Sequence, residues 1–200
     1  MDFTNDVLIH KNINGTEFIQ FRKLLEFPNV KHCYTLRKNG INIQVKGGDK
    51  AELIESYKKV AEALNFDYKN IVKPHQTHTD KVEVVSNVEE EFNEIDGLIT
   101  NKKDIFLCTT SADCTSLFFY DDNRKVVADV HSGWKGTLQK IGKKAVEKMI
   151  KEFGCNPKDI ICCIGPCIKK CHFEVDEDVM SKFQNEFEYT GRITEIIEKG

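Results

Sequence analysis

The stretch "VVADVHSGWKGT" (residues 126–137) contains the pattern that decides the fold. It begins with a short apolar run that is typical of a buried β-strand. A second such run, "SLFFY" (116–120), ends just before it, and the Asp-Asp-Asn sequence at 121–123 is typical of a tight turn. The two runs are therefore predicted to form a β-hairpin. Beyond the hairpin, a histidine, a tryptophan and a lysine stand in a glycine-containing turn, which indicates that the turn presents functional side chains.

Strand-like runs continue on both sides of the hairpin. They are "TEFIQF" (16–21), "HCYTL" (32–36), "KVEVV" (81–85), "GLIT" (97–100), "IFLCTT" (105–110) and "DIICCIG" (159–165). Turns are predicted at Asn39-Gly40 and at Gly47-Gly48. Because strands dominate the middle of the chain without a regular βαβ repeat, the pattern favours an α+β fold with mixed or antiparallel sheets over a doubly wound parallel sheet.

Three helices are predicted among these strands. The first begins after Asp49, a residue suited to cap a helix, and has apolar residues at helical spacing as far as Leu64. The second has the same spacing from Leu138 to Phe153 and ends at a glycine. A short third helix is predicted over residues 176–187. No linker, repeat or low-complexity tract divides residues 1–200, so we expect a single domain.

The composition is that of an ordinary soluble globular protein. Of 200 residues, 40% are hydrophobic and 30% are charged, and the net charge is -3. This balance argues against a nucleic acid or a membrane surface as the main partner. The first residues carry no apolar secretory segment, and no run approaches the ~18 apolar residues of a membrane span. We therefore expect a cytoplasmic protein, in which the eight cysteines are reduced.

Three potential metal ligands stand at the predicted ends of strands or in the turns beside them. These are His78, Cys114 and His131. Two imidazoles and one thiolate are a good ligand set for zinc and leave a fourth position open for water or substrate. Each residue alone is more commonly a surface or core residue, and their spacing fits no local zinc-finger rule. Asp113, beside the cysteine, is a candidate proton acceptor or a group that orients a ligand.

The turn after His131 offers features suited to a nucleotide-like ligand. The backbone N–H groups of residues 132–136 are predicted to form an anion-binding nest. Lys135 would add a point charge for phosphate, and Trp134 a face on which a planar base could stack, although core packing of the tryptophan is an equal alternative. The order of glycine and lysine does not match a Walker loop.

Five motifs in order, taken together, resemble one protein family. They are "QTHTDKV" (76–82), "DGLIT" (96–100), "SADCTSLFFYD" (111–121), "VVADVHSGWKGT" (126–137) and "IGPCIKKCHFEV" (164–175). The chain is similar from about residue 32 to 190 to the YfiH family of laccase-domain proteins, formerly called multicopper polyphenol oxidases. The resemblance implies a sandwich of mixed β-sheets flanked by helices, akin to the cysteine-hydrolase domain of deamidating toxins.

The resemblance also implies an activity. Family members look like zinc-dependent enzymes that phosphorolyse adenosine, inosine, guanosine and methylthioadenosine and that deaminate adenosine. The small-molecule partners would be nucleosides and phosphate, and the one zinc ion per chain would be held by His78, Cys114 and His131. Arg37 matches a family arginine that looks like a phosphate ligand, and Gln76 and Lys135 match positions lining the same pocket.

Two departures from the family pattern stand out. Lys135 stands where the family often has arginine, which would keep the charge and lose bidentate recognition of phosphate. Family chains normally continue past Gly200 with another segment, so the sequence is expected to lack the family's C-terminal part.

Several alternatives remain open at this point. Cys114 could be a nucleophile with His131 as base, as in metal-independent cysteine hydrolases. Copper-dependent phenol oxidation is less favoured, because six dispersed histidines are few for multicopper chemistry. A non-enzymatic interaction module would leave the aspartate-cysteine and histidine-glycine-tryptophan stretches without a purpose. The cysteines between Cys155 and Cys171, together with His172, could form a second metal site, but strand alternation points Cys162 and Cys163 to opposite faces and favours a structural role.

Overall fold

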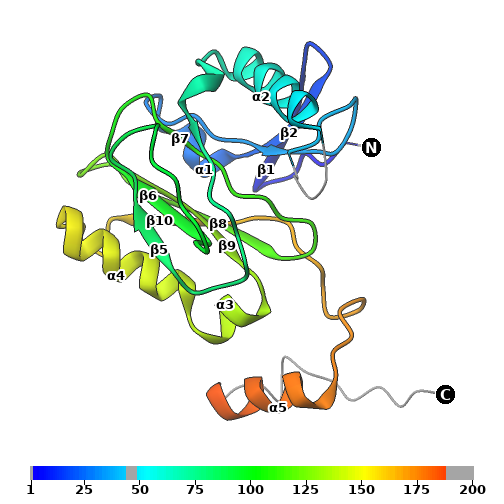
Figure 1. Cartoon of the computed structure of the whole chain (residues 1–200), viewed down its shortest axis with the longest axis vertical. Helices are drawn as coiled ribbons and strands as arrows, with labels where there is room; N and C mark the ends of the chain where they lie inside the picture. The colour runs from blue at the N-terminus through cyan, green and yellow to red at the C-terminus, as the bar shows by residue number, and fades with distance from the viewer. Residues whose placement is uncertain (1, 44–48, 188–200) are drawn as a thin grey trace.

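The computed structural model describes residues 2–43 and 49–187, and within them three β-sheets and their helices build the molecule. The N-terminal sheet is antiparallel and has the order β1 (Leu8–Ile13), β2 (Thr16–Phe21) and β3 (Tyr34–Thr35). The short helix α1 (Arg22–Leu25) follows β2 directly. The longer α2 (Lys50–Leu64) lies beside this sheet (Figure 1).

The five-stranded central sheet contains the predicted hairpin. Its order is β10 (Ile160–Ile164), β8 (Thr115–Asp121), β9 (Val126–Ser132), β6 (Gly97–Thr100) and β5 (Val82–Val84). The β5–β6 pair is parallel and the other three pairs are antiparallel, so the sheet is mixed. A separate parallel pair joins β4 (Ile71–Val72), which follows a 3-10 turn (Tyr68–Asn70), to β7 (Phe106–Leu107). The prediction of an α+β fold with mixed sheets is confirmed.

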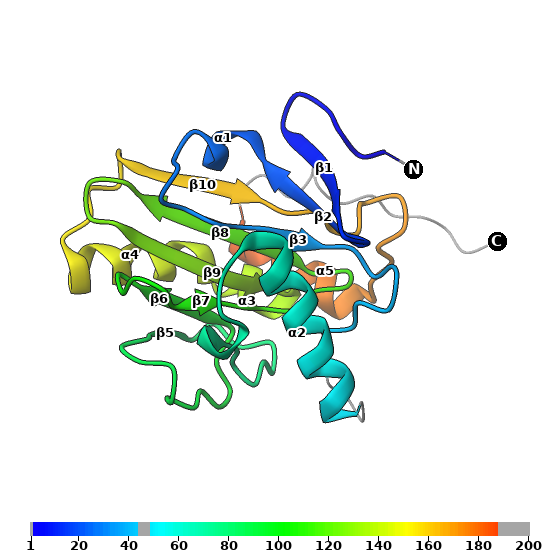
Figure 2. The same ribbon diagram turned by 90° about the horizontal axis from the view of Figure 1, so that it is seen from above.

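Apolar side chains on the two faces of the central sheet meet different layers. On one face, Val126, Ala128 and Val130 pack against α4 (Ile141–Phe153), whose apolar residues reach the core at helical spacing. On the other face, Tyr120 of β8 packs with Phe21 at the end of β2. The central sheet therefore lies between α4 and the N-terminal sheet with α1, as the view from above shows (Figure 2).

Local sequence signals explain the boundaries of the main helices. Asp49 caps α2, because its carboxylate accepts a hydrogen bond of 2.9 Å from the backbone N–H of Ala51. Gly154 ends α4 in the left-handed conformation, as glycine does at helix C-termini. The final helix, α5 (Glu177–Glu186), lies away from the sheets (Figure 1). No helix among residues 2–43 and 49–187 is long and apolar enough to cross a membrane.

The structure corrects several local predictions. The expected nest at 132–136 is replaced by the start of a short helix, α3 (Trp134–Leu138), in which the Thr137 N–H donates to the Gly133 carbonyl. The helix expected from Leu138 is two helices, because Lys140 between them takes a left-handed conformation. The polar strand β1 was not predicted at all. The turn predicted at Gly47-Gly48 lies outside the described residues, and the likeness to cysteine hydrolases stays a prediction.

Candidate metal centre and pocket

Two neighbouring strands and one loop bring the predicted metal ligands together. His131 lies near the end of β9, Cys114 directly precedes β8, and His78 lies in the loop before β5. The ligand atoms of all three residues lie within 4.8 Å of one another. The two imidazole rings meet edge to face, with centroids 4.9 Å apart. Within the described part of the chain this is the one His/Cys/Asp/Glu group with such convergence.

A buried carboxylate, which was not predicted as a site residue, supports this cluster. Asp96 directly precedes β6 and is fully buried. Its Oδ1 lies 2.8 Å from Nδ1 of His131, and the carboxylate also accepts hydrogen bonds from the backbone N–H groups of residues 77–79. The signal for it was present in the quoted motif "DGLIT", where an acidic residue precedes a fully buried strand. Such a residue needs partners in the interior.

Hydrogen bonds and burial shift the pKa values of His131 and Asp96 in opposite directions. Burial lowers the pKa of His131, but hydrogen bonds with Asp96 and Cys114 and the charges of both residues outweigh it and raise the pKa to about 9. Burial raises the pKa of Asp96, and the hydrogen bonds from His131 and Thr79 outweigh that effect and lower it. Both shifts have one main opposing cause to burial, the hydrogen bond between the buried carboxylate and the imidazole ring.

Close packing at Gly133 completes the centre. This glycine is the N-cap of α3, with ordinary backbone angles of φ -70° and ψ 174°. A Cβ added there would lie 2.7 Å from Cδ2 of His78 and 3.3 Å from Sγ of Cys114. The first distance is far shorter than van der Waals contact. Glycine is required here for space and not for backbone freedom.

A pocket of about 500 Å³ opens over the metal-type cluster. Its lining includes His78, Cys114 and the predicted residues Asp113, Trp134 and Lys135. This volume falls within the range of small-molecule sites, ~300–1,000 Å³. Asp113 and Lys135 are both exposed. Five of the eight residues predicted for the site therefore line one pocket, and His131 is buried beside two of them, His78 and Cys114.

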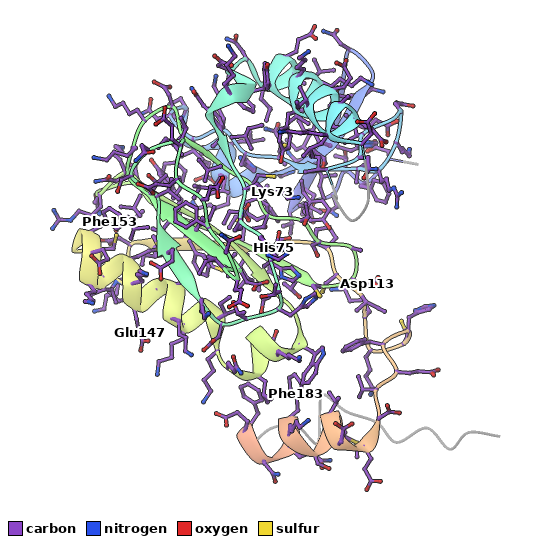
Figure 3. The ribbon with its side chains drawn as sticks, in the orientation of Figure 1. Lys73, His75, Asp113, Glu147, Phe153 and Phe183 are labelled. Atoms are coloured by element: carbon purple, nitrogen blue, oxygen red, sulfur yellow. The ribbon has the colours of Figure 1, made fainter. Side chains whose placement is uncertain are left out.

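The pocket lining also includes residues that were not predicted as site residues. Among them are Cys167, Ile168, Phe173 and Phe183. The Ile168 N–H donates to the Asp113 carbonyl at 2.9 Å, so the loop after β10 runs beside the segment that carries Cys114. Figure 3 shows Phe183 on α5 and Asp113 on the sheet side of the molecule. Cys167, Ile168 and Phe173 lie in the motif at 164–175, and a structural role was predicted for the cysteines of this segment.

Trp134 is flanked by ammonium groups from two helices. Nζ of Lys135 and Nζ of Lys182 lie 5.6 and 5.7 Å from the ring centroid. Both distances are within the range of cation–π attraction. The indole therefore lines the pocket and is not packed in the core.

The two remaining predicted residues lie elsewhere. Gln76 has both ends of its amide on Thr110: Nε2 donates to the Thr110 carbonyl at 2.9 Å, and Oε1 accepts from the Thr110 N–H at 2.8 Å. This clamp joins the segment before His78 to the segment before Cys114. Arg37 is exposed after β3. Neither is among the lining residues of the pocket, and their contacts with substrate stay predictions.

The cysteines of the 155–171 segment do not converge. Cys162 is exposed and Cys163 is buried, as strand alternation predicts. Sγ of Cys171 lies 3.0 Å from Nδ1 of its neighbour His172 at the surface. Among the described residues, no second group with metal-binding convergence includes them.

The fold and the site define an α+β protein with a His-Cys-His metal-type centre beneath an open pocket. The model of the multi-copper polyphenol oxidoreductase laccase family matches residues 31–199, and the chain belongs to this family.

The purine nucleoside phosphorylase YlmD of Bacillus subtilis is 34% identical over 139 residues, which is 65% of this chain and 50% of that protein. A purine nucleoside phosphorylase of Clostridium acetobutylicum is 34% identical over 178 residues, covering 88% of this chain and 72% of the relative.

A solved structure extends this likeness to the fold. The crystal structure of the hypothetical protein YfiH of Bacillus licheniformis matches with a TM-score of 0.83 and 27% identity. The match covers 94% of this chain and 78% of that one. This chain thus spans half of YlmD and a larger share of the other two proteins.

Proposed function

We propose that the protein is a zinc-dependent purine nucleoside phosphorylase that accepts adenosine, inosine, guanosine and methylthioadenosine and also deaminates adenosine. The observation that carries the proposal is the convergence of His78, Cys114 and His131 beneath a pocket large enough for a nucleoside. The names of the relatives support the phosphorylase activity. The proposal places the enzyme in the cytoplasm as a single domain.

The donor set fits zinc. Two imidazoles and one thiolate within 4.8 Å of one another are borderline and soft donors, which zinc prefers in sites that keep an open position. When bound, the metal would supply Lewis acidity to oxygen and nitrogen groups of the substrate. Copper, which the family's description names, shares imidazole and thiolate as ligands, so the identity of the metal is a matter for measurement.

Phosphorolysis requires an anion to be held beside the sugar. Phosphate attacks the anomeric carbon, the bond from that carbon to the purine nitrogen breaks, and the purine leaves. Lys135 is the exposed cation in the pocket lining and is proposed to hold phosphate. Arg37 is proposed as a second phosphate ligand, and Trp134 as an aromatic contact for the base. Gln76 acts on this site through its clamp on Thr110.

In deamination, water adds to C6 of the purine and the amine leaves as ammonia, which requires a proton on the leaving nitrogen. Asp113 lines the pocket beside Cys114, and it is proposed to carry this proton. One pocket can serve both reactions if the nucleoside binds in two poses, with either C6 or the anomeric carbon at the reacting position.

A second candidate function is that of a metal-independent hydrolase with Cys114 as its nucleophile. One observation favours it: His131 is hydrogen-bonded to Asp96, and Cys114 lies within reach on its other side. A thiol, an imidazole and an orienting carboxylate in this order are the parts of a cysteine nucleophile site. This reading gives no role to His78, which the zinc proposal uses.

Metal analysis combined with two activity assays separates the candidates. The purified protein is expected to contain one zinc ion per chain and to release hypoxanthine from inosine only when phosphate is present. Cys114→Ala is expected to lose both the zinc and the activity. Cys162→Ala, which changes an exposed cysteine on β10 outside the pocket, is the matched control and is expected to keep both.

Three results would change the assignment. Stoichiometric zinc in the Cys114→Ala protein would remove the cysteine from the ligand set. Activity that survives complete removal of metal by a chelator, yet is lost in Cys114→Ala, would support the cysteine hydrolase. Stoichiometric copper with phenol oxidation would favour the oxidase named by the family.

A further inference from the structure

One buried carboxylate organises both imidazoles of the centre. Asp96 accepts five hydrogen bonds through its side chain. Oδ1 accepts from the His78 N–H at 3.1 Å and lies 2.8 Å from Nδ1 of His131. Oδ2 accepts from the N–H groups of Thr77 and Thr79 at 3.3 and 2.7 Å, and from the Thr79 hydroxyl at 2.8 Å. A carboxylate has about four lone-pair sites, so its acceptor capacity is used in full.

We propose that Asp96 is the positioning residue of the metal centre, which fixes the tautomer of His131 and the loop conformation that presents His78. The inference rests on the proposed zinc site. It concerns the protein's own hydrogen bonds and not a further metal ligand.

The contact with His131 decides which ring nitrogen faces the metal. Because Nδ1 lies against the carboxylate, Nδ1 carries the proton and Nε2 is the nitrogen left for Cys114 and the metal. The backbone adds to this constraint, since the His131 N–H donates to the Asp96 carbonyl at 2.7 Å. The ring and the main chain of His131 are thus both held by one residue of the neighbouring strand.

The contact with the loop decides where His78 lies. Three successive N–H groups point at one carboxylate, which is how a backbone nest binds an anion. Within this nest His78 has a φ of 62°, in the left-handed region that costs a non-glycine residue about 1 kcal/mol or more. The Asp96 carboxylate accepts hydrogen bonds from this residue and from both of its neighbours in the chain. The carboxylate is the group that holds the loop around itself.

An amide cannot replace the carboxylate in this role. Asparagine has one acceptor oxygen and an NH₂ group that only donates. If its oxygen takes the place of Oδ2 and accepts from Thr77 and Thr79, its NH₂ faces both the His78 N–H and Nδ1 of His131 and favours the tautomer with the proton on Nε2. If the amide is reversed, the loop loses its anion. Either arrangement disturbs one of the two histidines.

The test compares Asp96→Asn with a matched change at another buried aspartate. Asp121 is also fully buried, and it accepts hydrogen bonds from the backbone N–H groups of Asn123 and Arg124 at the far end of the β8–β9 hairpin. Zinc dissociation constants are measured by competition with a chromophoric chelator. Asp96→Asn is expected to raise the constant about 10- to 100-fold, the usual effect of removing a partner of a ligand. Asp121→Asn is expected to leave it within about twofold of the original protein, by the independence of distant sites.

A second measurement uses the unsubstituted protein and so does not depend on whether a variant folds. In zinc-loaded protein, nitrogen chemical shifts of His131 are expected to show a protonated Nδ1 and a metal-bound Nε2. Metal binding through Nδ1, or an unchanged zinc affinity in a folded Asp96→Asn protein, would overturn the inference. If the unsubstituted protein binds no zinc, the proposed function fails instead, so the two failures are distinguishable.

Discussion

Substituting Gly133 by alanine tests whether the centre is as closely packed as the structure shows. The new Cβ would lie 2.7 Å from Cδ2 of His78, whereas carbon atoms in contact are ~3.5–4.0 Å apart. Either the backbone at residue 133 or the His78 ring must therefore move by about 1 Å. His78 is exposed and its ring can swing outward, so we expect the displacement to fall on the metal ligand while the fold is kept.

The expected loss of zinc affinity follows from the free-energy cost of overpacking. Such insertions cost about 1–3 kcal/mol, which corresponds to a zinc dissociation constant about 5 to 150 times higher. Gly142→Ala is the control, because its added Cβ would meet only the ends of the Leu117 and Phe119 side chains, 3.1 and 3.9 Å away, on the α4 side of the sheet. Zinc affinity is measured by chelator competition and folding by thermal unfolding. If Gly133→Ala bound zinc as tightly as Gly142→Ala, His78 would not be a ligand in the position described.

Three further predictions address the pocket and the pH dependence of stability. Lys135→Ala should raise the KM for phosphate about tenfold, an estimate for one charged contact, and the KM for inosine much less; equal changes would argue against a phosphate contact. Asp113→Asn should keep its zinc and lose ammonia release from adenosine by about 100-fold, well beyond its loss of hypoxanthine release from inosine, and equal losses would make the carboxylate structural. Burial lowers the pKa of His32 to about 4, below its ordinary 6.5, so folding favours the neutral ring. The free energy of unfolding should therefore fall by up to about 3 kcal/mol between pH 6.5 and pH 4, and urea unfolding of His32→Gln should show a correspondingly weaker pH dependence.

The fold was predictable where the apolar residues of a segment form a simple pattern. Gly97–Thr100 is buried at every position, and its bounds agree with the predicted strand. The six residues of β1, "LIHKNI", are partly or largely exposed, and they are a strand only because β2 pairs with them. Such a strand has no periodic signal of its own. The short α3 contains a glycine and a threonine with weak helix propensity, so it also depends on its tertiary surroundings.

The site was predictable as a set of residue types, and its geometry depends on strand register, which the sequence does not give. Pairing of Thr115 with Ser132 places Cys114 beside Gly133, and pairing of Gly97 with Val130 places Asp96 opposite His131. A slip of one residue would turn Cys114 to the other face of the sheet. A slip of two residues would keep the face but move the thiol by about 7 Å, at ~3.4 Å per residue. This exceeds the 4.8 Å that spans all three ligands. The register is set by burial of Val126, Ala128 and Val130 against α4 along the length of the hairpin. The apolar pattern of β9 therefore does more than bury a strand, because it also fixes which three side chains can share one metal ion.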